Sequence, residues 1–136
     1  MSNLEQTLSI IKPDAVERNL AEEIKNIFVK NRLNIKDSKK IHITKDEAAE
    51  FYKVHQSKPF YNDLCSYLSS GPIIVMILEG ENAVLANRKL MGTTNPKEAD
   101  ENTIRKLYGI SIDKNSVHGS DSVENAKIEI DFFFKD

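Results

Sequence analysis

The chain has 136 residues, of which 40% are hydrophobic and 29% are charged, and its formal net charge is −2. This length supports one hydrophobic core, and the composition is too apolar for a disordered chain. The near balance of charge excludes the basic excess that is typical of dedicated nucleic-acid binders, although a few well-placed cations can still bind a small anion.

The first 31 residues predict a strand followed by helices. Thr7 to Ile11 is β-branched and apolar, which is typical of a buried strand, and Pro13 ends it and opens a short helical turn with Asp14. Apolar residues then recur at helical spacing, which predicts a helix over 20–31.

The next stretch predicts a strand and two helices. Apolar and polar residues alternate over most of 33–43, as in a strand with one polar face. Thr44 and Glu47 have the spacing of a capping box, so a helix should run from Thr44 to about His55. Pro59 begins another helix, whose apolar side contains Phe60, Leu64, Tyr67 and Leu68.

A buried strand and a helix come next. Gly71-Pro72 breaks the preceding helix, residues 73–78 form a continuous apolar run typical of a strand buried on both faces, and Gly80 ends it. Residues 81–91 are expected to be helical, with Val84, Leu85 and Leu90 facing inward.

Residues 92–115 form one long irregular region with a short helical piece over 103–108, and long loops in compact domains are usually functional or disordered. Asp121 with Glu124 has the spacing of a capped helix start, and a closing helix is marked by Val123, Ala126, Ile130 and Phe133. The predicted order is β-α-β-α-α-β-α-loop-β-α. Helices separated by single strands favour an α+β sandwich of the split βαβ kind.

Several classes of protein are excluded by what the sequence lacks. Its longest purely apolar run, residues 73–78, is much shorter than a membrane-spanning helix, and no signal peptide is visible, so we expect a cytoplasmic protein. The single cysteine, Cys65, permits no internal disulfide, and its apolar neighbours favour a packed thiol. His42 and His55 have ordinary settings, and the three histidines lack the spacing of a zinc site.

If the protein binds nucleotide phosphates, side chains must supply the donors, because the five glycines form neither a GxxxxGK[ST] nor a GxGxxG pattern. Lys12 follows the first strand, Arg88 lies on the helix before the irregular region, and Arg105 lies within that region. Guanidinium groups suit bidentate contacts with phosphate. The alternative is that the lysine is a solvated strand-end residue and that each arginine lies on the surface.

His118 has the most informative surroundings. It lies just before the helix start expected near Asp121, where backbone N–H groups and the helix dipole favour an anion, and Gly119 removes a side chain beside it. A neutral imidazole can attack phosphorus, and Glu129 of the last helix is a candidate partner that orients it. The alternative for His118 is a loop histidine with a structural hydrogen bond. The alternative for Glu129 is a carboxylate at the edge of the apolar stripe of the last helix.

The string Asn115-Ser-Val-His118-Gly-Ser-Asp121 resembles the active-site signature of nucleoside diphosphate kinases. The resemblance covers essentially the whole chain, because further family motifs follow in order and at the family's spacing. They are Ser9-Ile-Ile-Lys12-Pro-Asp-Ala-Val16, Phe51-Tyr52 with His55 and Lys58-Pro-Phe60, Ser70-Gly-Pro, Leu78-Glu-Gly-Glu-Asn-Ala83, Arg88, Met91-Gly-Thr-Thr-Asn-Pro96 and Thr103-Ile-Arg105. The resemblance implies one nucleoside diphosphate kinase-like domain over 1–136, with a ferredoxin-like fold in which helices cover a four-stranded antiparallel sheet.

The resemblance also implies a ping-pong phosphotransferase that maintains the pools of nucleoside and deoxynucleoside triphosphates. His118 would take the γ-phosphate of ATP or another triphosphate, become phosphohistidine, and pass the group to a nucleoside diphosphate. Mg²⁺ is expected on the nucleotide phosphates rather than on protein side chains. By position in the family motifs, the resemblance assigns catalysis to His118, Lys12, Tyr52 and Glu129, with Ser120 in support. It assigns phosphate binding to Lys12, Arg88, Thr94 and Arg105. The sugar would be contacted by Asn115 and Lys12, and the base by Phe60 and Leu64.

The chain departs from the family pattern at Glu22, Glu101-Asn102 and Lys106-Leu107, and it stops at Asp136 without the longer tail of many relatives. None of these positions matches a residue assigned to phosphate or base. They lie largely in the loop and tail that the family uses between subunits. The implied homo-oligomer therefore stays open between a tetramer and a hexamer.

Two other classes of protein fit parts of the sequence. A nucleotide-binding or regulatory module of this fold would lack turnover, but some relatives of that kind have lost the histidine, whereas His118 is present here. A nucleic-acid binder would use Lys36, Lys39 and Lys40, which are more simply a solvated face in a chain of net charge −2. The expected partners are nucleoside tri- and diphosphates, with no membrane and no specific nucleic acid.

Overall fold

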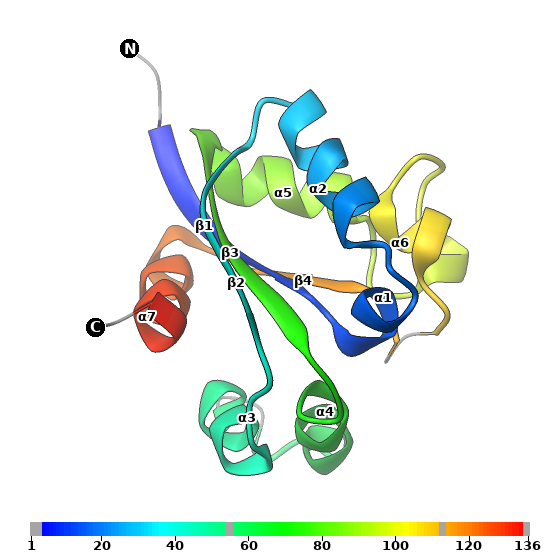
Figure 1. The fold of residues 1–136 in the computed structure, drawn as a ribbon, viewed down its shortest axis with the longest axis vertical. Helices are drawn as coiled ribbons and strands as arrows, with labels where there is room; N and C mark the ends of the chain where they lie inside the picture. The colour runs from blue at the N-terminus through cyan, green and yellow to red at the C-terminus, as the bar shows by residue number, and fades with distance from the viewer. Residues whose placement is uncertain (1–3, 54–55, 112–113, 135–136) are drawn as a thin grey trace.

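A four-stranded antiparallel sheet lies at the centre of the computed structural model, which describes residues 4–53, 56–111 and 114–134 (Figure 1). Its strand order is β2-β3-β1-β4, which confirms the ferredoxin-like α+β prediction. The strands are β1 (Leu4–Ile11), β2 (Asn34–Ile41), β3 (Ile73–Glu81) and β4 (Val117–Gly119). The central strands β1 and β3 pair along the full length of β1, and β4 pairs with the other side of β1 near its end.

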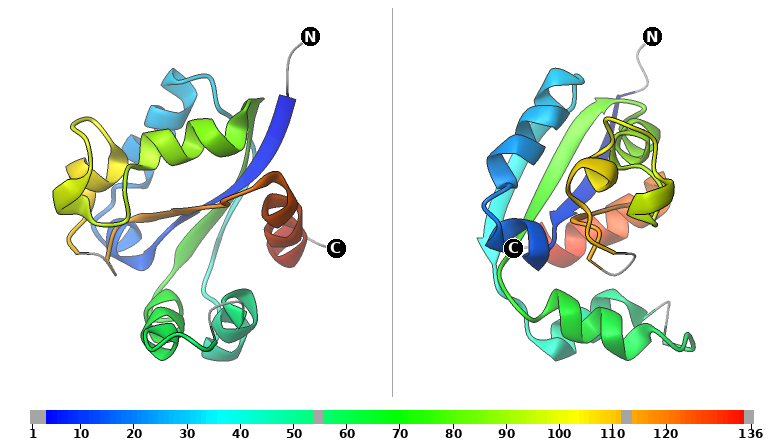
Figure 2. Two further views of the ribbon diagram at one scale, coloured as in Figure 1. Left: turned by 180° about the vertical axis from the view of Figure 1, so that it is seen from behind. Right: turned by 90° about the vertical axis from the view of Figure 1, so that its right-hand side faces the viewer.

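Helices connect the strands and pack on both faces of the sheet. They are α1 (Pro13–Glu17), α2 (Ala21–Lys30), α3 (Lys45–Phe51), α4 (Tyr61–Leu68), α5 (Ala83–Met91), α6 (Ile104–Tyr108) and α7 (Val123–Phe134), with a short 3₁₀ helix, η2, over Pro96–Glu98. Figures 1 and 2 show α3 and α4 side by side beyond one end of the sheet.

Two hydrophobic cores follow from the alternation of side chains along the strands. Ile11 of β1 and Met76 of β3 pack with residues of α1, α2, α5 and α6, whereas Ile10 and Val75 pack with residues of α3, α4 and α7. Because successive strand residues point to opposite faces, the same two strands supply both cores. Burial on both faces explains why residues 73–78 of β3 form a continuous apolar run in the sequence.

The boundary between β3 and α5 differs from the prediction. Gly80 does not end the strand, because β1 begins as early as Leu4 and gives Gly80 a partner in Glu5. α5 then begins only after Asn82, whose φ of 50° is in the left-handed region that asparagine tolerates. Leu85 was expected to face inward but is 69% exposed, since it lies on the solvent side of α5.

The other helix ends differ from the prediction by small shifts. The capping box of Thr44 and Glu47 is confirmed, but α3 ends at Phe51, and His55 lies outside the described residues. The next helix, α4, begins two residues after Pro59.

The capping pair predicted at the start of α7, Asp121 with Glu124, is not the one that caps the helix. Ser122 Oγ accepts from the backbone N–H of Asn125 at 3.1 Å, as an N-cap side chain does. Asp121 instead accepts from the Asn125 side chain at 2.6 Å. Val123, at the first position of the helix, is exposed rather than part of the core.

Other residues singled out in the sequence have plain structural settings. Cys65 is buried, as predicted. Lys36, Lys39 and Lys40 are exposed on β2, and His42 is exposed with Nε2 2.8 Å from the carbonyl oxygen of Ser69. Within the described ranges, no helix combines the length and apolar character needed to cross a bilayer.

Candidate active site

His118 lies on β4, a strand of only three residues whose pairing with β1 places His118 opposite Ile10. Its Nε2 atom is 2.9 Å from Glu129 Oε1 on α7, and the buried Ser120 hydroxyl donates to that same oxygen at 2.9 Å. Because a carboxylate only accepts hydrogen bonds, this contact assigns the proton to Nε2, which in the neutral imidazole leaves the lone pair on Nδ1. The structure thus brings together three residues that the sequence analysis had grouped.

Gly119 is required by α5 rather than by the imidazole. A Cβ atom at this position would lie 2.3 Å from Asn87 Nδ2 and 2.9 Å from Met91 Cε. The space that the sequence analysis placed beside His118 is therefore filled by side chains of α5. Asn87 is fully buried, and its side-chain amide has no hydrogen-bond partner among the described residues.

Lys12 is buried, so its interpretation as a solvated strand-end lysine is wrong. It is the N-cap residue of α1, and its Nζ atom donates to Asn115 Oδ1 at 2.9 Å. The buried Asn115 in turn donates from Nδ2 to the carbonyl oxygen of Thr94 at 3.1 Å. These contacts join the end of β1 to both ends of the long irregular region.

Arg105 is 9% exposed, so its interpretation as a surface arginine is also wrong. Its guanidinium donates to the carbonyl oxygens of Gly92 at 3.0 Å and Val117 at 2.9 Å, which fixes it beside β4. Burial, followed by the positive charge of Arg88, lowers the pKa of Arg105 to about 10, so the group stays charged at neutral pH. Arg88 itself is exposed on α5.

One cavity of about 1190 Å³ joins these residues. Ten of the eleven predicted site residues line it, and Ser120 is buried behind Glu129. The lining residues are Lys12, Tyr52, Phe60, Leu64, Arg88, Thr94, Arg105, Asn115, His118 and Glu129. Burial and the charge of Glu129 raise the pKa of Tyr52, so its phenol stays protonated.

The cavity also has an aromatic and apolar side. Phe60, the N-cap residue of α4, is 43% exposed, and Leu64 lies one turn further along the same helix. An exposed aromatic ring at the wall of a cavity offers a flat surface for a planar ligand.

Sequence reasoning gave no role to Phe51, Asn125, Ile128 or Phe132, which also line the cavity. The Phe51 ring packs edge-on against His118, with the ring centroids 5.3 Å apart. Its place next to Tyr52 was the available signal for a second aromatic wall residue. The residues on α7 had no such signal, because their contribution depends on where that helix packs against the sheet.

Comparisons with known proteins agree with this geometry. The family described as Nucleoside diphosphate kinase matches residues 5–136. A nucleoside diphosphate kinase of Rhizorhabdus wittichii is 59% identical over 131 residues, which cover 96% of this chain and 94% of that protein. One from Campylobacter jejuni is 57% identical over 132 residues, which cover 97% of this chain and 96% of that protein.

Solved structures agree as well. The crystal structure of the Aquifex aeolicus nucleoside diphosphate kinase superposes with a TM-score of 0.95 at 40% identity and covers 97% of this chain and 96% of that one. The enzyme from Encephalitozoon cuniculi gives a TM-score of 0.94 at 39% identity and covers 97% of this chain and 90% of that one. The chain therefore belongs to the nucleoside diphosphate kinase family, and it is a nucleotide-binding phosphotransferase of that kind.

Proposed function

We propose that this kinase transfers the γ-phosphate of ATP, or of another nucleoside triphosphate, to a nucleoside diphosphate through a phosphohistidine on Nδ1 of His118. The observation that carries the proposal is the 2.9 Å contact between His118 Nε2 and Glu129 Oε1. This contact engages the protonated nitrogen and leaves Nδ1 as the nucleophile, in a residue that lines the cavity.

The reaction balances in two half-reactions at one site. In the first, the Nδ1 lone pair forms a P–N bond while the bond from the γ-phosphorus to the bridging oxygen breaks, and a nucleoside diphosphate leaves. In the second, a terminal oxygen of another diphosphate attacks the same phosphorus, and the P–N bond breaks to restore the imidazole. Glu129, held by Ser120, stabilises the positive charge that develops on the ring.

The phosphates would be bound by side chains, of which two are already held in place by the protein. Lys12 and Tyr52 would contact the transferred phosphoryl group, and Arg88, Thr94 and Arg105 would contact the outer phosphates. Lys12 and Arg105 are buried cations fixed by hydrogen bonds to protein oxygens, so little reorganisation is needed when negative charge arrives.

The nucleoside would be bound with little selection among bases. Phe60 would stack on the base, Leu64 would close the clamp, and Asn115 with Lys12 would contact the sugar hydroxyls. Stacking does not distinguish strongly among the bases, because every base has a π face. This arrangement supports the proposal that the enzyme serves all common nucleotides and so maintains triphosphate and deoxytriphosphate pools.

Mg²⁺ would accompany the nucleotide. Among the described residues, no group of three or more His, Cys, Asp or Glu side chains is arranged to hold a metal ion, whereas phosphate oxygens are ligands that Mg²⁺ prefers. An ion carried on the phosphates would supply charge neutralisation there when bound.

We further propose that residues 1–136 act as a single domain in a cytoplasmic homo-oligomer, either a tetramer or a hexamer. Exposed apolar side chains support association between copies, among them Leu85, Leu107 and Ile110. Sedimentation velocity measures the number of subunits directly.

The proposed relay is tested by labelling. The protein is incubated with Mg²⁺ and γ-labelled ATP, nucleotide is removed, and the label on the protein is examined. We expect acid-labile, alkali-stable label that GDP discharges as GTP, and we expect none on His118→Ala, which should still fold and bind ATP. Near-normal transfer by His118→Ala would refute the relay. ATP binding without label on the wild-type protein would instead identify a binding module.

A further inference from the structure

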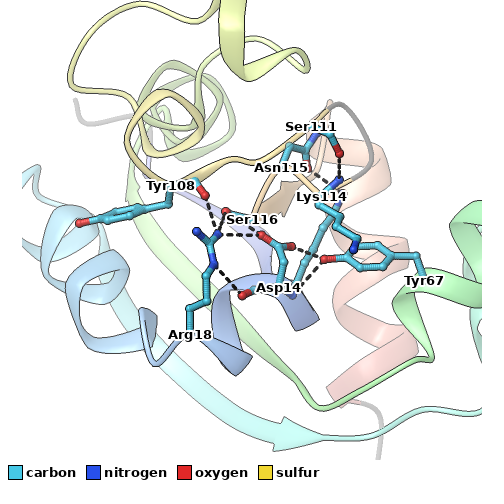
Figure 3. A network of polar contacts seen from close by, with 9 residues as sticks. Asp14, Arg18, Tyr67, Tyr108, Ser111, Lys114, Asn115 and Ser116 are labelled. Carbon is cyan, nitrogen blue, oxygen red and sulfur yellow. Dashed lines mark hydrogen bonds and ion pairs between the residues drawn. The ribbon is translucent and has the colours of Figure 1, made fainter.

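Asp14 connects several segments around the nucleotide cavity through one buried carboxylate, as Figure 3 shows. Its Oδ2 atom accepts from Ser116 Oγ at 3.0 Å and from Arg18 Nη2 at 3.2 Å. Its Oδ1 atom accepts from the Tyr67 hydroxyl. Asp14 does not line the cavity, so these contacts point to a role that is exerted through other residues.

Ser116 links Asp14 to the proposed sugar contacts. It directly follows Asn115, and its carbonyl oxygen accepts from the backbone N–H of Lys12 at 2.8 Å. Its φ of 75° is in the left-handed region, which is unfavourable for a residue with a side chain. The hydrogen bond from its hydroxyl to Asp14 favours this backbone conformation, and the conformation sets where the side chain of Asn115 lies.

The other partners of Asp14 bring in two further helices. Tyr67 lies on α4, the helix of the proposed base-binding wall, and its hydroxyl also accepts from the backbone N–H of Asp14 at 2.9 Å. Arg18 donates to the carbonyl oxygen of Tyr108 at 2.5 Å, at the end of α6, which carries Arg105. The carboxylate therefore meets donors from three directions.

The Tyr67 hydroxyl is a neutral donor to the Asp14 carboxylate. Burial and the hydrogen bond with Asp14 raise the pKa of Tyr67, so its phenol remains a donor. A buried carboxylate that loses a neutral donor keeps an unsatisfied lone pair, and the segments around it shift to satisfy it.

We propose that Asp14 is a positioning residue for nucleotide binding, which holds Asn115 and Lys12 through the Ser116 hydroxyl and holds α4 against them through the Tyr67 hydroxyl. The proposal rests on the proposed contact of Asn115 and Lys12 with the sugar hydroxyls. It requires that loss of the Ser116 hydroxyl weakens ligands that carry those sugar hydroxyls and hardly affects ligands that lack them.

The test is calorimetric titration of the 136-residue chain with ADP and with 2′,3′-dideoxyadenosine diphosphate. Ser116→Ala should weaken ADP binding about ten-fold, the effect of one hydrogen bond to a charged group, and should weaken dideoxy binding less than about two-fold. Ser116→Gly, which relieves the left-handed backbone but also lacks the hydroxyl, should behave like Ser116→Ala.

Tyr67→Phe gives an independent second variant with a matched control. It should weaken ADP binding about five-fold. Tyr61→Phe removes a hydroxyl from the same helix, but that hydroxyl donates to the carbonyl oxygen of Ala49 at 3.0 Å instead, so ADP binding should stay near the wild-type value. Because Ser116 and Tyr67 donate to the same carboxylate, their effects should be non-additive in the double variant.

Each alternative outcome overturns a stated part of the argument. Equal losses for both ligands in Ser116→Ala would mean a general structural role, and recovery in Ser116→Gly would mean that backbone conformation alone matters. Similar losses in Tyr61→Phe and Tyr67→Phe would refute the role of Asp14 in holding α4. If the wild-type protein itself binds both ligands equally, the sugar contact fails and the positioning role fails with it, while transfer to GDP remains a separate measurement.

Discussion

Replacement of Gly119 by alanine tests whether α5 determines where His118 lies. The new methyl group would be 2.3 Å from Asn87 Nδ2, whereas ordinary van der Waals contact begins at 3.4 Å. Because the Asn87 and Met91 side chains that it meets are buried and have little room to move, we expect β4 and α5 to separate by up to about 1 Å (3.4 − 2.3 Å). Overpacking of a buried site costs about 1–3 kcal/mol. For a domain of this size, this lowers Tm by about 3–10 °C.

Activity should fall more than stability. Displacing a catalytic group by about 1 Å costs on the order of 100-fold in rate. The three-residue strand β4 has little length over which to absorb the shift before His118. Both quantities are measured directly, by thermal unfolding and by a coupled assay of phosphate transfer from ATP to a second nucleoside diphosphate.

A second substitution makes the reasoning refutable. Asn87→Ala in the Gly119→Ala background removes the shortest clash, since the Asn87 amide has no hydrogen-bond partner among the described residues, and leaves the contacts with Met91, so it should restore part of the activity and Tm. Gly71→Ala is the matched control, because its new methyl group would meet Pro13 Cβ at an ordinary 3.6 Å. Wild-type behaviour of Gly119→Ala, or failure of Asn87→Ala to restore it, would show that this contact does not position His118.

Three other substitutions probe different parts of the site. Phe60→Ala should weaken the binding of all nucleotides by a similar factor in calorimetric titrations, and a loss confined to purines would show that base edges are read. Arg105→Lys should lower kcat/KM about ten-fold or more, because lysine cannot donate in a fork to both Gly92 and Val117, and an unchanged value would contradict this. Glu129→Gln should slow the labelling of His118 about ten-fold by removing the charge that stabilises the imidazolium, and unchanged labelling in a rapid-quench experiment would exclude that role.

Local chemistry explains why most of the elements were predictable. The capping box at Thr44 depends only on residues three positions apart, and the buried strand over 73–78 is visible as a continuous apolar run. The wrong predictions concern positions whose structure depends on a segment far away in the sequence. Gly80 remains in β3 because β1 offers it a partner, and Leu85 faces solvent because of the way α5 packs on the sheet.

The sequence by itself determined the kinds of elements, their order, and the motifs that resemble one kinase family. Only the tertiary structure decided that Lys12 and Asn115, 103 residues apart, share a hydrogen bond and that Glu129 meets Nε2 of His118. The same holds for the burial of Arg105, because its local sequence favours a surface arginine. The physical reason is range: periodicity and capping depend on near neighbours in the chain, whereas burial, pKa and hydrogen-bond partners depend on how helices pack against the sheet.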